Sequence, residues 1–289
     1  MQDSPVIVGG VGGSGTRIIS EALIEMSFDM GHTLNHASDN LLFTLLFKRK
    51  DWLLRNLDND KVMDPLVETF FALSKTDTPM KSHHYYEFFK VLIDWLSRKE
   101  TVDGLGRRFA YKNARKIFAN RRNKPCDMPL WGWKEPNSWL LLPHFKRAFP
   151  NMKYIHTIRH GVDMSLSNNQ QQCINWSQHL VGQTVSNTSC SPSQSLHFWV
   201  EANRRVLEFG NTLPASQFLV VKFEDLCLKP ESEMQKVVDF LDVDISEETR
   251  LKVLGLPDAV KSQQKFTNND LKQYEEKDLV ALSEFGYST

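Results

Sequence analysis

Four short apolar runs recur along the chain, and each is followed by a turn or a helix signal. They lie at residues 5–9, 130–134, 152–158 and 217–222. Their apolar residues are continuous rather than alternating, which is typical of strands covered on both faces. Segments with helical spacing separate them. The pattern therefore predicts an α/β fold in which helices flank a central sheet.

The long segment between the first two runs has apolar residues at three- and four-residue spacing, which is typical of amphipathic helices. It predicts helices over 40–57, 64–73, 85–98 and 106–123. We interpret 40–123 as a helical insertion in a single domain that spans residues 1–289. The last of these helices carries seven Lys and Arg residues and no acid. This basic surface either steers an anionic ligand or is a solvated face balanced by acids elsewhere.

Residues 168–195 are rich in Ser, Asn and Gln and show little periodicity. A loop of this length is often a lid or a binding loop, so we predict either a substrate lid or a plain surface loop. Helices are predicted beyond it over 197–209 and 230–241, the second with proline in its first turn. The tail from residue 260 predicts a loop and a short helix.

The composition narrows the classes of partner. The 289 residues include 35 Lys and Arg and 35 Asp and Glu, so the formal net charge is zero. Binding to extended nucleic acid without sequence preference needs many uncompensated cations. The apolar runs are far shorter than the roughly 20 residues of a membrane helix, and no basic segment precedes the first strand. We expect a cytoplasmic protein with neither a nucleic acid nor a membrane as partner.

Four cysteines, at positions 126, 173, 190 and 227, form no C-x-x-C pair and have no metal-like spacing to histidine. Free thiols are the expectation in a reducing cytosol. The alternative is a disulfide between Cys173 and Cys190, because these two bracket one polar segment.

The first predicted strand continues into a glycine-rich turn and then a helix, in the sequence VIVGGVGGSGTRIISEAL that starts at Val6. Backbone N–H groups and the positive end of a helix dipole can bind a phosphate there. Gly10-x-Gly12-x-x-Gly15 matches the dinucleotide fingerprint, which also requires an acid about 20 residues further on. Asp29 and Asp39 are badly placed for that role.

The same turn also matches the first half of a P-loop, because Gly10 and Gly15 have the required spacing. Thr16 and Arg17 then occupy the positions where a P-loop has Lys and Ser or Thr. That hydroxyl holds Mg²⁺, and that lysine reaches the outer phosphates of ATP. The turn therefore predicts binding of an anion that arrives without magnesium. Close packing alone is the alternative use of these glycines.

A second anion site is predicted where the third strand ends. Arg159 follows this strand directly, and Ser167 lies eight residues further on, on the following helix turn. The guanidinium can bind a phosphate through a fork and the serine through a single donor. Because the carboxyl ends of parallel strands share one crevice, we expect Arg159 near the glycine-rich turn. Two anion sites in one crevice predict a ligand with two separated phosphate groups.

At these residues the chain resembles the sulfotransferases that use 3′-phosphoadenosine-5′-phosphosulfate (PAPS), in their bacterial and tyrosylprotein-like branches. The family's 5′-phosphosulfate loop corresponds to Gly13-Ser14-Gly15-Thr16, and its 3′-phosphate site to Arg159 and Ser167. GWKEP at 132–136 and LVVKFEDL at 219–226 match two further family segments in the expected order. The resemblance spans about residues 5–245 and implies a P-loop-like fold with a central parallel sheet.

The resemblance also implies the ligands. PAPS would be the donor, 3′-phosphoadenosine-5′-phosphate (PAP) the product, and a hydroxyl or an amine the acceptor group, with no metal. A small-molecule acceptor is favoured over a secretory-pathway glycan or protein, because a soluble chain without a membrane anchor is not typical of a Golgi enzyme. The implied donor-binding residues are Gly12, Gly13, Ser14, Gly15, Thr16, Arg17, Arg159, Ser167, Lys265 and Phe266. Lys265 and Phe266 would replace the basic, glycine-rich C-terminal loop that many members have and this chain lacks.

In-line transfer of a sulfuryl group requires neutralisation of charge on the bridging oxygen and a base for the acceptor proton. Lys134, at the end of the second strand, is the first candidate for the cation, and Arg17 is the second. Asp39 and His36 are candidates for the base. Three other functions are weighed: an Mg·ATP-dependent kinase, a nicotinamide-dependent oxidoreductase and a non-catalytic nucleotide-binding protein. The oligomeric state is not predicted.

Overall fold

The computed structural model describes residues 4–75, 78–98, 105–123, 130–186, 188–257 and 266–288. Two compact units interleave along the chain. The first unit contains Met1–Ile7, Ser27–Glu135 and Leu141–Met152, and the second contains Val8–Met26, Pro136–Leu140 and Lys153–Thr289. The sequence prediction of a single domain stays a prediction. Lys265 and Cys126 lie outside the described residues.

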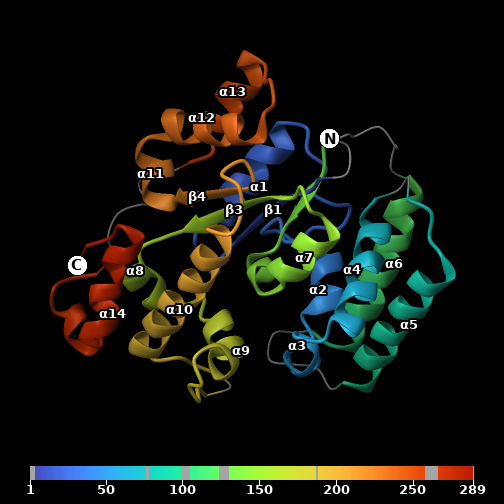
Figure 1. The fold of residues 1–289 in the computed structure, drawn as a ribbon, viewed down its shortest axis with the longest axis horizontal. Helices are drawn as coiled ribbons and strands as arrows, with labels where there is room; N and C mark the ends of the chain where they lie inside the picture. Colours follow the sequence, from blue (N-terminus) through green and yellow to red (C-terminus); the bar gives the residue numbers. More distant parts are fainter. Residues whose placement is uncertain are drawn as a thin grey trace. The chain divides into compact units, whose positions relative to one another are not determined.

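A four-stranded sheet has the order β2-β1-β3-β4 (Figure 1). Its strands are β1 (Val6–Gly10), β2 (Gly132–Lys134), β3 (Lys153–Ile158) and β4 (Phe218–Lys222). All four apolar runs are thus confirmed as strands. β3 and β4 are parallel, with Tyr154 opposite Phe218. Burial on both faces is confirmed for the first three strands but is wrong for β4, an edge strand in which Val220 is 37% exposed.

The helical insertion predicted in the first unit is confirmed. Its helices are α2 (Leu41–Phe47), α3 (Lys50–Asn56), α4 (Asp60–Ser74), α5 (Ser82–Ser97) and α6 (Arg107–Asn123), and α7 (Leu142–Ala148) packs on α4. The single helix predicted over 40–57 is two helices. Arg49 explains the break, because its side chain donates hydrogen bonds to the Leu46 carbonyl at the end of α2.

Aromatic rings form the core of the first unit. The ring centroid of Trp133 lies 4.9 Å from those of both Phe70 and Phe145, and Phe43 and Phe47 join the same cluster. Trp133 is fully buried, as are Trp139, Trp176 and Trp199 to within a few per cent. These tryptophans therefore serve packing rather than exposed base stacking.

The second unit carries the remaining helices (Figure 1). They are α1 (Thr16–Glu25), α8 (Gly161–Ser165), α9 (Gln171–Leu180), α10 (Pro192–Gly210), α11 (Phe223–Leu228), α12 (Pro230–Leu241), α13 (Glu247–Leu254) and α14 (Glu276–Ala281). The helix α10 packs on α8 and α9, and α1 packs on α13. Helices predicted over 197–209 and 230–241 are confirmed as α10 and α12.

The polar segment 168–195 is not a long loop. It contains α9 and the first turn of α10. Cys173, Trp176 and Leu180 form a buried stripe at helical spacing on α9. A disulfide joins Cys173 to Cys190, whose Cα atoms are 6.4 Å apart. The expectation of free thiols is therefore wrong for these two cysteines, whereas Cys227 is a buried free thiol.

Candidate functional site

The turn between β1 and α1 has a backbone conformation and close neighbours that leave no room for a side chain at Gly13 or Gly15. Gly13 and Gly15 have φ angles of 100° and 92°, in the left-handed region that favours glycine. A Cβ atom on Gly13 would lie 3.2 Å from the Met164 side chain, and one on Gly15 would collide with the ring of Phe223. Phe223 and Met164 thus pack against the turn itself.

The helix that follows this turn offers free hydrogen-bond donors to an anion. No side chain caps the N-terminus of α1, and its first turn contains no acid. Its first backbone N–H groups and the positive end of its dipole are therefore available to a phosphate. Gly13 and Arg17 are exposed there, whereas Ser14 and Thr16 are buried.

Ser14 has an internal role. Its Oγ atom hydrogen-bonds the Thr157 Oγ1 atom of β3 at 2.9 Å, and its backbone N–H donates to the Val11 carbonyl at 3.0 Å. The Ser14 side chain therefore ties the turn to the sheet. This geometry favours Gly13, Arg17 and the helix N–H groups as the ligand-facing part of the predicted loop.

Arg159 lies beside the glycine-rich turn, within the same unit. Its guanidinium carbon is 4.7 Å from the centroid of the Phe223 ring, and the same ring abuts the Cα atom of Gly15. The side chain of Arg159 is 14% exposed, and its Nη2 atom is 3.9 Å from Asp163 Oδ2. The structure thus places Arg159, which follows β3, close to the glycine-rich turn, which follows β1. This is expected because the carboxyl ends of parallel strands meet at one edge of a sheet.

Ser167 lies in the turn after α8 and not on a helix, which corrects the sequence expectation. Its Oγ atom accepts a hydrogen bond from the Asn169 backbone N–H at 3.2 Å. Asn169 and Met164, on either side of Ser167 in the sequence, lie within 3.2 Å of the Cβ positions of Gly12 and Gly13. The segment that carries Ser167 therefore follows the glycine-rich turn.

Residues of α9 and α11 complete this part of the site, and sequence reasoning missed them. Gln172 donates to the Gly10 carbonyl at 3.4 Å and accepts from the Trp139 indole N–H at 3.4 Å. Gln172 was missed because the sequence predicted a loop over residues 168–195. Phe223 lies inside the LVVKFEDL segment, so the family match pointed to its neighbourhood but not to its contacts.

Phe266 lies at the same end of β3. Its ring centroid is 4.8 Å from that of His160, the residue after Arg159. The backbone N–H of His160 donates to Glu224 Oε1 at 2.9 Å, which fixes the start of α8. Phe266 is buried. Lys265 lies outside the described residues, so its predicted role stays a prediction.

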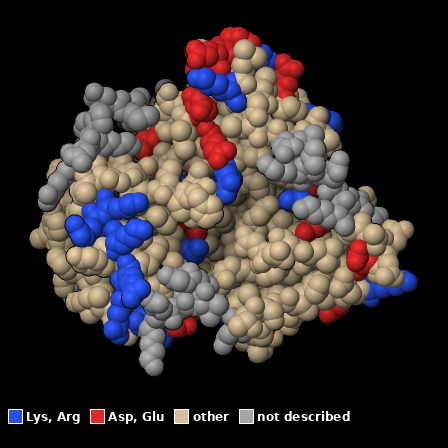
Figure 2. Space-filling model, turned by 180° about the vertical axis from the view of Figure 1, so that it is seen from behind, with Lys and Arg blue, Asp and Glu red and all other residues tan. Residues whose placement is uncertain are grey.

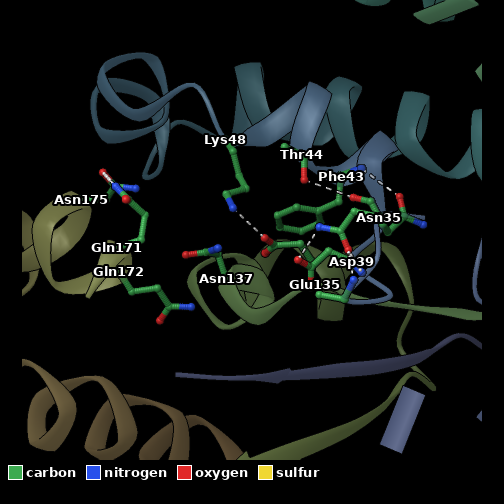
Figure 3. A network of polar contacts seen from close by, with 12 residues as sticks. Asn35, Asp39, Phe43, Thr44, Lys48, Glu135, Asn137, Gln171, Gln172 and Asn175 are labelled. Atoms are coloured by element: carbon green, nitrogen blue, oxygen red, sulfur yellow. Dashed lines mark hydrogen bonds and ion pairs between the residues drawn. The ribbon is translucent and has the colours of Figure 1, made fainter. Parts of the chain in front are cut away.

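Three of the four predicted catalytic residues, Lys134, Asp39 and His36, lie in the first unit. The Lys134 ammonium forms an ion pair with Asp39 Oδ1 and donates to the Ala37 carbonyl at 2.9 Å. Asn35 donates from Nδ2 to Asp39 Oδ2 at 2.9 Å (Figure 3). Lys134 is only 3% exposed. Because both carboxylate oxygens of Asp39 are engaged, the geometry favours a positioning role for Asp39 over that of a general base.

Glu135 and His36 differ from this pair. Glu135 is completely buried, and its Oε1 atom lies 3.1 Å from Lys48 Nζ (Figure 3). Its partner thus differs from that of Lys134, as strand alternation predicts for adjacent residues. His36 is exposed and makes no side-chain hydrogen bond or ion pair with the described residues. Its imidazole is therefore accessible for proton transfer.

Two groups of potential metal ligands occur among the described residues, both in the first unit. They are Glu68, His83 and His84, and Asp60, Asp64 and His144. Arg147 already donates to Asp60 and Asp64, at 2.6 and 2.8 Å. Neither group includes a residue that the sequence predicted for the site.

Comparison with known proteins shows the family to which the chain belongs. Residues 5–247 match the model of the sulfotransferase family, and the chain belongs to this family. It is 30% identical over 116 residues to a "Putative protein-tyrosine sulfotransferase" of Caenorhabditis briggsae. That match covers 40% of this chain and 38% of the relative, so the chain spans about two fifths of the curated relative's length.

Two solved structures share the fold. The sulfotransferase domain of the Synechococcus PCC 7002 olefin synthase is 18% identical, with a TM-score of 0.51 over 99% of this chain and 97% of that one. The sulfotransferase domain of the curacin biosynthetic pathway is 17% identical, with a TM-score of 0.52 over 99% and 98%. The predicted family and the parallel α/β fold are thereby confirmed.

Proposed function

We propose that this chain is a PAPS-dependent sulfotransferase that transfers a sulfuryl group to a hydroxyl or an amine of a small-molecule acceptor. The observation that carries the proposal is the packing of Phe223 against both Gly15 and Arg159. Two predicted anion-binding features thereby lie side by side in a chain of the sulfotransferase family. The family match does not favour a kinase or an oxidoreductase.

The residues present fit a nucleotide with two separated phosphate groups. The N-terminus of α1 and the open surface at Gly13 suit the 5′ group, because a side chain on Gly13 would fill this space. Arg159 and Ser167 suit the 3′-phosphate, with Phe266 nearby at His160. PAPS, when bound, supplies a sulfur–oxygen bond whose cleavage leaves PAP.

The chain's own groups would then neutralise charge on the bridging oxygen. Arg17 is exposed in the first turn of α1, next to the N–H groups that face the turn. Lys134, the first candidate from the sequence, stays a predicted cation for this charge, and within the first unit Asp39 and the Ala37 carbonyl hold its ammonium in one orientation. The sulfuryl group carries less charge than a phosphoryl group, so we propose that these cations suffice without a metal.

His36 is the proposed general base. Its imidazole is exposed and can accept the proton of a hydroxyl or an amine. Asp39 is already bonded through both oxygens, so it would hold Lys134 instead.

The cytoplasmic location expected from the sequence stays a prediction. Disulfides are rare in the cytosol and persist in oxidising compartments. The Cys173–Cys190 disulfide therefore speaks against this location.

A transfer assay tests the proposal. The purified chain is incubated with PAPS and EDTA and offered phenols, alcohols and amines in turn, and PAP and sulfated product are quantified by liquid chromatography and mass spectrometry. The proposal predicts equal amounts of PAP and sulfated acceptor. Binding of PAP without transfer to any acceptor would favour the non-catalytic alternative, and consumption of Mg·ATP would favour the kinase.

A further inference from the structure

Half of the exposed large apolar side chains in the described part of the chain lie on two neighbouring helices of the first unit. Twelve such side chains occur, and six belong to α5 and α6. These six are Tyr85, Tyr86, Phe89, Ile93, Leu96 and Tyr111, each between 44% and 65% exposed. The other six lie singly on different elements, which is normal for a protein surface. A concentration of exposed apolar side chains such as that on α5 and α6 is typical of interaction sites.

The helix α5 has two apolar faces. Phe88, Val91 and Trp95 are buried, and they form the face that packs on the unit's core. Tyr85, Phe89 and Leu96 form a second stripe at helical spacing, and this stripe is exposed. A helix that covers only its own core needs one apolar face, so the second face has no structural use within the described residues.

A groove runs between α5 and α6. The two helices are antiparallel, because Phe88 faces Phe118 at 5.1 Å between centroids while Trp95 faces Phe109 at 5.8 Å. Ala110 and Ala114 of α6 are small and leave a hollow of about 510 Å³ between the helices. Tyr85, Phe89, Leu96 and Tyr111 line its rim. The exposed apolar stripe and the hollow therefore form one continuous apolar surface.

Cations border this surface. Five exposed side chains of α6 are basic, namely Arg107, Arg108, Lys112, Arg115 and Lys116, and the helix contains no acid. Figure 2 shows a run of Lys and Arg side chains on the side where α6 lies. Lys112, Arg115 and Lys116 form no ion pair with the described residues. The acids of neighbouring α5 are already paired, Glu87 with Lys90 and Asp94 with two arginines.

We propose that the α5–α6 face, defined by its six exposed apolar side chains and the five cations of α6, is a docking surface for an anionic lipid bilayer. Aromatic and aliphatic side chains that flank a basic stripe are typical of helices that lie in the plane of a membrane interface. The tyrosines, each with an apolar ring and a polar hydroxyl, suit the boundary between headgroups and acyl chains. Lys112, Arg115 and Lys116, which form no ion pair with the described residues, suit anionic headgroups.

The charge distribution favours a bilayer over a second copy of this chain. A two-fold dimer through this face would bring the same patch of both copies together, and the cations of α6 would oppose one another. A bilayer supplies the opposite charge. The sequence expectation of no membrane partner concerned spanning segments. Among the described residues no helix has the length and apolarity to cross a bilayer, and interfacial docking requires none.

Vesicle sedimentation tests the proposal with the full chain. Vesicles of phosphatidylcholine alone are compared with vesicles of equal parts phosphatidylcholine and phosphatidylserine. The wild type is expected to sediment with the anionic vesicles, and added NaCl is expected to release it. K112E/K116E should weaken the partition at least about 25-fold, because the loss of each cation near such a surface costs roughly fivefold and the new carboxylates add repulsion. F89S/I93S should abolish the partition that remains at high salt.

Matched controls separate docking from general effects. L251S/V280S removes two equally exposed apolar side chains elsewhere, and K252E/K277E reverses two exposed lysines elsewhere. Both should bind vesicles like the wild type, and all four variants should retain the wild-type circular dichroism spectrum and Tm. The proposal is overturned if the wild type does not sediment with anionic vesicles, or if the control variants lose as much vesicle binding as K112E/K116E and F89S/I93S. A concentration-dependent dimer that F89S/I93S abolishes, without vesicle binding, would assign this face to a second copy.

Discussion

Replacement of Arg159 by alanine removes one of the two proposed phosphate sites and leaves the glycine-rich turn intact. The Arg159 side chain is 14% exposed, and its guanidinium carbon lies over the Phe223 ring, 4.7 Å from the ring centroid. Its planar fork is thus oriented before a ligand arrives, so little conformational freedom is lost on binding. Because of this pre-organisation, we expect the Arg159 side chain to contribute strongly to the binding free energy of PAP.

The size of the effect follows from the bonds that are lost. Hydrogen bonds to a charged group contribute about 1.5–3 kcal/mol each, and a guanidinium can donate two to one phosphate. Some of this is recovered by water in the variant, so we expect a loss of about 2–4 kcal/mol. That corresponds to a Kd for PAP raised about 30- to 1,000-fold. Arg159→Lys keeps the charge but loses the forked pair of donors, so its Kd for PAP should lie between those of the wild type and Arg159→Ala.

Isothermal titration calorimetry with PAP in EDTA measures this directly. Arg250→Ala is the matched control, because Arg250 is an arginine of the same unit paired on the surface with Glu231 and Glu247. The control should bind PAP like the wild type. Loss of the cation–π contact with Phe223 should also lower the unfolding free energy of R159A by about 0.5–1 kcal/mol. If R159A binds PAP as tightly as the control, Arg159 is not part of a phosphate site.

Three further predictions concern the pKa of a buried histidine, the proposed cation and the disulfide. Burial lowers the pKa of His156 to about 4, and its ring hydrogen-bonds Asn203 Oδ1 at 2.8 Å. As pH falls from 6.5 to 4 the unfolded chain binds this proton and the folded chain does not, so stability falls by up to ~3 kcal/mol. Urea unfolding at several pH values should show the wild type losing its advantage over His156→Gln in this window, and a constant difference would refute this origin. Lys134→Ala should lower kcat about 100-fold or more, whereas Lys229→Ala, an exposed lysine, should not change it; equal rates would remove Lys134 from the mechanism. Alkylation of the unfolded, unreduced chain should spare Cys173 and Cys190 and modify Cys227; modification of all three would contradict the disulfide.

Much of the fold was predictable because local chemistry marks it. Each strand is a short apolar run that ends at a turn, and each insertion helix shows helical spacing. The helix α9 escaped because its buried stripe of Cys173, Trp176 and Leu180 stands among Ser, Asn and Gln. The break between α2 and α3 escaped because it depends on the side chain of Arg49, which binds a backbone carbonyl.

The candidate site was predictable to the extent that one segment carries each feature. The glycine-rich turn and Arg159 were found from strand ends, and the match to the family followed from their order. The contact of Phe223 with Gly15 and Arg159 joins three distant segments, so no local pattern encodes it. The same holds for the ion pair between Lys134 and Asp39, which were two separate candidates in the sequence and are bonded partners in the structure.

Thermal stabilisation by PAP tests the central claim most directly. The chain is heated with PAP, with Mg·ATP or with NAD, and EDTA is present in the PAP sample. Binding of a ligand to the folded chain at 100 times its Kd stabilises it by about 2.7 kcal/mol, which raises Tm by several degrees. The account predicts this rise with PAP in EDTA and little change with Mg·ATP or NAD. A rise with Mg·ATP or NAD and none with PAP would contradict it.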